Sequence, residues 1–151
     1  MSRATYIQPN LEEWTDKFHF FTNIRIRYCE TDMSGHLNNT HHIVYFEQGR
    51  LEYLEQLQFH HLPLTAVTAD ICCHYHSEAF LREELKLGVR TARLGNSSLD
   101  LEYCLQTAAD QRLVATGRGT LVFIDQNTKK STPIPDELRK QIEMVEGIGT
   151  A

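Results

Sequence analysis

Residues 29–47, CETDMSGHLNNTHHIVYFE, contain a turn-rich segment that leads directly into a helical pattern. Turn and cap residues dominate TDMSGHLNN, and from about Asn39 apolar side chains recur at steps of three and four residues. This spacing predicts one long helix that ends near Leu57, with Asn38 or Asn39 as its N-cap. Gly49 lies inside it, where glycine costs up to ~1 kcal/mol relative to alanine, so we expect a close contact with a sheet there.

The segments on both sides of this helix show the alternation of strands. Before it, residues 21–30 place Ile24, Ile26 and Tyr28 on one face. Four more strands are expected at residues 66–77, 84–94, 97–107 and 112–125. Residues 1–17 are expected to be a loose lead-in, and residues 135–147 a short C-terminal helix. This order predicts an α+β protein of one domain, residues 1–151, whose curved antiparallel sheet wraps around one long central helix.

The composition excludes several classes of protein. A net charge of −5 argues against a protein whose main partner is nucleic acid. No apolar stretch is long enough to span a membrane, and the N-terminal segment MSRATYIQPN lacks the apolar core of a signal peptide. The four cysteines form no C-x-x-C pair, which favours free thiols in a reducing compartment. We therefore expect a cytoplasmic protein with no membrane contact.

The segment YCETDMSGHLNNTHHIVYFEQGRLEYL, residues 28–54, resembles the active-site segment of the hotdog-fold acyl-CoA thioesterases of the 4-hydroxybenzoyl-CoA thioesterase type. RLGNSSLDLEY and ATGRGTLVFIDQNTKKSTPIPDELR are similar to the family's middle hairpin and last strand, so the resemblance covers residues 18–139. It implies the hotdog fold and hydrolysis of an acyl-CoA, aroyl-CoA or acyl-carrier-protein thioester. It also implies no cofactor, because coenzyme A is part of the substrate, and a homodimer or tetramer whose substrate lies between two chains.

Two departures from the family pattern concern this segment. The position of His36 is usually apolar in the 4-hydroxybenzoyl type. GHLNN resembles a second subgroup, which includes the plant acyl-carrier-protein thioesterases and has an Asp-x-Asn-x-His pattern. Here Ser34 occupies the middle position of that pattern. Asp32 is thus supported by both subgroups, His36 by one and Ser34 by neither.

Thioester hydrolysis needs a nucleophile or an activated water, and a group that stabilises the oxyanion. The free N–H groups of a helix start can serve the second purpose. In the family, the residue seven positions after the aspartate supplies such an N–H, and here that residue is Asn39. Asp32 would act as general base or as nucleophile, and His36 could orient Asp32, polarise the carbonyl or share the proton. Glu47 is the competing carboxylate, because related hotdog enzymes carry a catalytic glutamate on this helix.

Other residues are assigned to substrate binding or to structure. Gly35 and Asn38 flank the predicted catalytic residues. Residues near the hairpins could meet coenzyme A: Arg82, Arg90, Arg93 and Arg118 at its phosphates, and Ser97 and Ser98 along its pantetheine arm. The structural alternatives are that Asp32 caps a turn, that His36 is an ordinary loop residue and that Glu47 pairs with Arg50. The eight histidines have no H-x-x-x-H or H-E-x-x-H spacing, so no metal site is expected.

Two other classes of function are compatible with this fold. One is a non-catalytic domain that senses acyl-CoA or an acyl carrier, since a fold does not imply a function. A cluster of Asp32, Gly35 and His36 argues against it, because a binding module has no need of a base. The other is a hotdog hydratase or dehydratase, but TDMSGHLNN resembles the thioesterases better.

Overall fold

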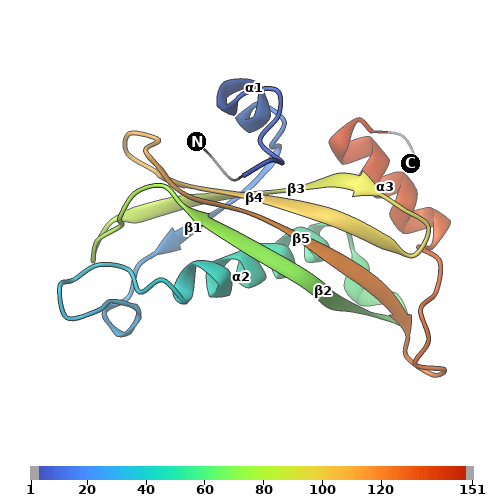
Figure 1. Ribbon diagram of the computed structural model, residues 1–151. Helices are drawn as coiled ribbons and strands as arrows, with labels where there is room; N and C mark the ends of the chain where they lie inside the picture. The colour runs from blue at the N-terminus through green and yellow to red at the C-terminus, as the bar shows by residue number, and fades with distance from the viewer. Residues whose placement is uncertain (1–3, 149–151) are drawn as a thin grey trace.

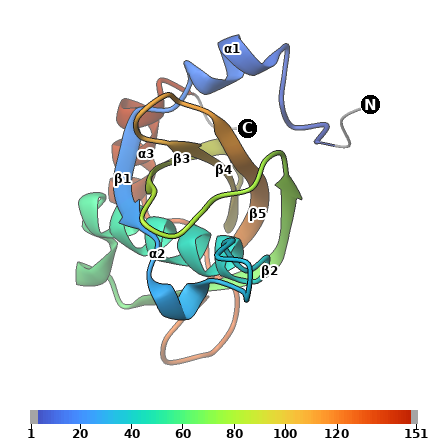
Figure 2. The same ribbon diagram turned by 90° about the vertical axis from the view of Figure 1, so that its left-hand side faces the viewer.

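The computed structural model describes residues 4–148, and its main feature is one curved sheet around one long helix (Figures 1 and 2). The strands are β1 (Phe20–Arg25), β2 (Leu64–Tyr75), β3 (Glu84–Leu94), β4 (Ser98–Thr107) and β5 (Leu113–Asp125). They pair antiparallel in the order β1-β3-β4-β5-β2, so β1 and β2 are the edge strands. Helix α2 (His41–Gln56) lies on the concave face. The predicted α+β hotdog fold is confirmed.

The contact between α2 and the sheet depends on a glycine. A Cβ atom on Gly49 would collide with the side chain of Leu87 and lie 3.0 Å from Cγ2 of Val89. The expected close approach at this glycine is therefore confirmed. One turn earlier, the ring of Phe46 stacks on Tyr103 with centroids 4.7 Å apart. Alternate residues of β4 supply much of the core beneath the helix: Leu99, Leu101, Tyr103 and Leu105.

The opposite face of α2 is left uncovered by the described residues, as the lower side of Figure 1 shows. Val44 and Leu51 are 48% and 51% exposed there, and Glu47 is also exposed. The neighbouring edge strand β2 is long and carries exposed Val67 and Tyr75. An apolar helix face beside the edge of a sheet is a surface that proteins usually cover.

The N-terminal segment is more ordered than the loose lead-in that the sequence suggests. It contains helix α1 (Leu11–Thr15), whose N-cap Asn10 accepts a hydrogen bond from the backbone N–H of Glu13. Trp14 is fully buried on the outer face of the sheet, where its Nε1 donates to Glu102 at 2.6 Å. This buried tryptophan explains why the segment packs, since a large aromatic surface with a satisfied N–H stabilises the docked position.

Several predicted element boundaries require correction. The first strand ends at Arg25, and residues Tyr28–Glu30 form a 3-10 helix (η1) in which Tyr28 is 81% exposed rather than on the buried face. Helix α2 begins at His41, later than predicted, because Asn38 Oδ1 accepts from the backbone N–H of Thr40 and holds the preceding turn.

The remaining elements complete the described chain. A second 3-10 helix, η2 (Phe59–His61), links α2 to β2, and α3 (Asp136–Glu146) ends at Gly147. Glu146 of α3 accepts hydrogen bonds from the Tyr53 hydroxyl and the Thr91 backbone N–H, which ties α3 to α2 and β3. No helix among residues 4–148 is long and apolar enough to cross a membrane. The cysteines are free thiols.

Candidate active site

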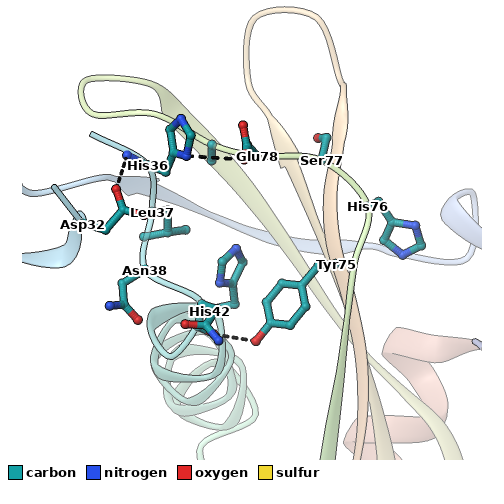
Figure 3. Close-up of a pocket in the computed structure, with 11 residues that line it drawn as sticks. Asp32, His36, Leu37, Asn38, His42, Tyr75, His76, Ser77 and Glu78 are labelled. Carbon is teal, nitrogen blue, oxygen red and sulfur yellow. Dashed lines mark hydrogen bonds and ion pairs between the residues drawn. The ribbon is translucent and has the colours of Figure 1, made fainter. Parts of the chain in front are cut away.

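The loop between η1 and α2 is shaped by the Asp32 carboxylate. Its Oδ1 accepts hydrogen bonds from the backbone N–H groups of Ser34 at 2.8 Å and His36 at 3.1 Å (Figure 3). Gly35 has a φ of +77°, which glycine adopts without strain and which closes the turn. Within the described chain, Asp32 Oδ2 has no hydrogen-bond partner. The same side chain thus caps a turn with one oxygen and presents the other to its surroundings.

A buried glutamate anchors this loop to the helix. Glu30 accepts hydrogen bonds from the Arg27 backbone N–H at 2.8 Å and from the Tyr45 hydroxyl of α2 at 2.9 Å. Its backbone carbonyl accepts from the N–H of Asn38. Burial alone would raise the pKa of Glu30, but the hydrogen bonds from Arg27 and Tyr45 outweigh it and lower that pKa below its ordinary value. Glu30 therefore holds the loop in place as a charged group.

Beside this loop lies an open cavity of about 450 Å³ at the start of α2. Residues of the loop, of α2 and of the segment after β2 line it: Asp32, His36, Leu37, Asn38, Asn39, His42, Tyr75, His76, Ser77, Glu78 and Ala79. Four residues predicted from the sequence to act in catalysis or binding thus meet at one cavity: Asp32, His36, Asn38 and Asn39. Gly35 is in the same loop but does not line it.

Just before the helix start, a residue that lines the cavity has a backbone donor that the described residues leave free. The carbonyl of Asn39 accepts a 2.5 Å hydrogen bond from the Tyr75 hydroxyl, while Asn38 accepts from Thr40 and His41. For the backbone N–H of Asn39, the described residues provide no acceptor. Free N–H groups at a helix start carry a partial positive charge and bind anionic oxygen. The site can therefore stabilise negative charge on a substrate oxygen.

The ring of His36 does not contact Asp32. Its Nδ1 lies 3.3 Å from the carboxylate of Glu78, and its ring packs edge-on against Phe80 with centroids 4.9 Å apart. His36 bonds to Asp32 through its backbone: its N–H donates to Asp32 Oδ1, and its carbonyl accepts from the Asp32 N–H at 2.8 Å. The backbone also joins this loop to the one after β2, since Leu37 N–H donates to the Ala79 carbonyl. His36 thus positions Asp32 through the main chain.

Sequence reasoning missed seven of the eleven residues that line the cavity, among them His42, Tyr75 and Glu78. No histidine spacing indicates His42, although the helical period places it on the same side of α2 as Phe46 and Gly49. Tyr75 alternates with Cys73 and Ile71 on the inner face of β2, a pattern that could have indicated it. Glu78 follows β2 in a loop and had no sequence signal. In the described part of the chain, no group of three His, Cys, Asp or Glu could hold a metal.

The other predicted residues lie away from this cavity. Glu47 is exposed on α2, near Arg50 and Tyr103. Arg82 is exposed in the loop between β2 and β3, with a φ of +75°. Ser97 and Ser98 are at the β3–β4 hairpin, where the chain reverses at the other end of β4.

The predicted arginines of β3 and β5 form ion pairs on the outer face of the sheet. Arg90 is buried and pairs at 2.5 Å with Glu102, which also accepts from Trp14, so its guanidinium is unavailable to a phosphate. Arg93 and Arg118 both pair with Asp100 on the outer face of the sheet. Residues on alternate positions of β3 and β5 face away from α2, which is why these side chains do not reach the cavity.

A curved sheet around a helix, with an acid-bearing loop at the helix start, defines a site of the hotdog thioesterase class. Residues 26–142 match the thioesterase-like superfamily. The chain is 31% identical over 144 residues to YsmA, an uncharacterized protein of Bacillus subtilis, covering 94% of this chain and 97% of YsmA. It is 25% identical over 130 residues to the long-chain acyl-CoA thioesterase FadM of Escherichia coli, covering 82% and 97%.

A solved structure with the same fold is a thioesterase of Thermus thermophilus in complex with coenzyme A and zinc. It superposes with a TM-score of 0.77 at 27% identity, over 89% of this chain and 99% of that one. The chain described here belongs to the thioesterase-like superfamily, and the protein is a thioester hydrolase.

Proposed function

We propose that this protein hydrolyses acyl-CoA thioesters, with Asp32 as the reacting carboxylate and the Asn39 N–H as a donor to the thioester carbonyl. One observation carries the proposal: a carboxylate with a free oxygen and a helix start with a free N–H line the same cavity among the described residues. Asp32 is held by two backbone donors on Oδ1, so Oδ2 is oriented without being occupied.

The chemistry has two routes that share these groups. In one, Asp32 Oδ2 removes a proton from a water whose oxygen attacks the carbonyl carbon. In the other, Oδ2 attacks that carbon itself and forms a mixed anhydride, which water then hydrolyses. In both, the negative charge that develops on the carbonyl oxygen is stabilised by the Asn39 N–H. The C–S bond breaks and coenzyme A leaves as a thiolate, which needs no dedicated acid.

The similarity to FadM and to the coenzyme A complex supports a CoA thioester rather than another ester. A long-chain acyl group is the first candidate for the acyl part, because FadM is a long-chain enzyme. Acyl carrier protein as the carrier and an aroyl group are the alternatives to compare. We place the reaction in the cytoplasm, where acyl-CoA is formed and free thiols persist.

We further propose that the protein works as a homodimer or tetramer. Within one chain, Asp32 is exposed, the cavity is open and the outer side of α2 is uncovered by the described residues. A second chain placed over α2 and along the edge of β2 would cover Val44 and Leu51 and exclude water from bound substrate. Water exclusion strengthens the electrostatic stabilisation on which the proposed mechanism depends.

Thiol release from a panel of thioesters tests the proposal. The panel compares long-chain, short-chain and aroyl-CoA, and one long-chain acyl carrier protein, at equal concentration. We expect the highest kcat/KM with a CoA thioester. Tight binding of every member without thiol release would contradict the proposal and favour the sensing domain. Addition of water across the double bond of an enoyl-CoA, without hydrolysis, would favour the hydratase.

A further inference from the structure

His42 is a buried imidazole on the active-site cavity for which the mechanism above has no role. It lies in the first turn of α2 and is 4% exposed, yet it lines the same cavity as Asp32. Figure 3 shows its ring rising from the helix start into the space between Asn38 and Tyr75. Tyr75 holds it in place, with ring centroids 4.8 Å apart and planes at 82°.

The hydrogen bonding of this ring is incomplete. Its Nδ1 is enclosed and has no hydrogen-bond partner among the described residues. Because Nδ1 is shut off from solvent, Nε2 is the nitrogen that can meet the cavity. The backbone carbonyls of Asn38 and Asn39 lie beside the ring. In the neutral tautomer that carries its hydrogen on Nδ1, Nε2 is left as an acceptor.

The protonation state of the ring fits this role. Burial lowers the pKa of His42 below 6.5, against a smaller opposing effect of the Asn38 and Asn39 carbonyls, so the ring is neutral near pH 7. The titratable groups that share the cavity with it, and the one beside it on α2, are Asp32, His36, Tyr75, His76, Glu78 and His41. A neutral imidazole is a better base at neutral pH than an exposed carboxylate.

We propose that His42 is a further catalytic residue, whose Nε2 removes a proton from the water that hydrolyses an acyl–Asp32 anhydride. This rests on the proposed function and selects the second of its two routes. In the first step, Asp32 Oδ2 bonds to the acyl carbon, the C–S bond breaks and the thiolate leaves with the electron pair. In the second, the water oxygen bonds to the same carbon and a water proton moves to His42. The bond between that carbon and Asp32 Oδ2 breaks, so the free acid and the Asp32 carboxylate are released. The imidazolium then returns the proton to solvent.

The test is rapid-quench kinetics of His42→Gln with a long-chain acyl-CoA. We expect a burst of about one thiol per active site, followed by turnover at least about 10²-fold slower than in wild type. Mass spectrometry of the quenched protein should find the acyl group on the peptide that contains Asp32. His41→Gln, a matched change on the next residue, should keep wild-type kinetics, because His41 does not line the cavity.

Two results overturn the inference: wild-type turnover in His42→Gln, or slow turnover with neither a burst nor an adduct. His42→Asn repeats the measurement if the glutamine variant has a lowered midpoint of thermal unfolding. Failure of the proposed function is recognised separately, because wild type itself would then release no thiol, or Asp32→Asn would remain active.

Discussion

At the residue scale, Glu30 determines where the loop that carries Asp32 lies. Three donors converge on its two carboxylate oxygens: the Arg27 backbone N–H, the Arg27 guanidinium and the Tyr45 hydroxyl. Glu30 is 3% exposed, so these bonds replace its contacts with water. Because the Asn38 N–H donates to the Glu30 carbonyl, a shift of Glu30 would also move the start of α2.

Glu30→Gln should therefore destabilise the protein at pH 7. The amide can accept with one oxygen only and turns an NH₂ group toward a donor, which should cost about 1–3 kcal/mol of unfolding free energy. Urea denaturation measures it. Glu55→Gln, an exposed change on α2, is the matched control and should have no effect.

The stability difference between wild type and Glu30→Gln should decrease as the pH is lowered. The pKa of Glu30 is lowered in the folded protein, so its charged form contributes stability above the ordinary glutamate pKa. That contribution is lost as the pH falls through the lower, folded value. The difference between wild type and Glu30→Gln should shrink below about pH 4. A difference that grows on acidification would contradict this account of the loop.

The sequence predicts those residues of the cavity that lie within one short segment. It misses the residues that reach the cavity from distant parts of the chain. Asp32, Asn38 and Asn39 could be predicted because one short segment holds both the turn and the helix start. Tyr75 and Glu78 come from a strand and loop more than thirty residues away. Arg90 looked available to a phosphate, but burial beside Glu102 depends on the docking of Trp14, which no local pattern indicates.

At the element scale, the distance between α2 and the sheet depends on Gly49. Gly49→Ala should gain up to ~1 kcal/mol in helix propensity but lose about 1–3 kcal/mol by overpacking against Leu87, which is fully buried. We expect a net loss of stability in chemical denaturation.

Leu87→Ala supplies the control through a double-mutant cycle with Gly49→Ala. The new methyl group should fill part of the space that the smaller side chain leaves, so the two changes together should cost less than their sum. Additive effects, or a Gly49→Ala variant more stable than wild type, would show that the helix does not lie as close to β3 as described.

The element order was predictable because each segment has its own period, 3.6 for α2 and 2 for the strands. The predicted boundaries are wrong where the contacts of a single side chain outweigh the periodic spacing of apolar residues. Asn38 accepts a hydrogen bond from the Thr40 N–H, so α2 begins later than predicted. Trp14 donates to Glu102 and packs α1 against the outer face of the sheet. Tyr28 continues the alternation of β1 in the sequence, but the η1 turn places it in solvent.

At the scale of the whole molecule, the described residues of one chain leave the outer side of α2 uncovered. Figure 2 shows α2 beside the edge strand β2. The cavity lined by Asp32 and His42 is formed partly by the start of α2 and the end of β2. Sedimentation equilibrium should give two or four times the 17.5 kDa mass of the chain at micromolar concentration. A monomer with full activity would contradict the proposed assembly, and would mean that one chain completes the site.

The central claim is that Asp32 is the reacting carboxylate, and the most direct test is the kcat of Asp32→Asn with the best CoA thioester of the panel. Asparagine keeps the acceptor for the Ser34 and His36 N–H groups, so the loop should remain in place. We predict a loss of at least about 10²-fold in kcat with little change in binding. A variant within about threefold of wild type would contradict the claim and make Glu47 the carboxylate to test next.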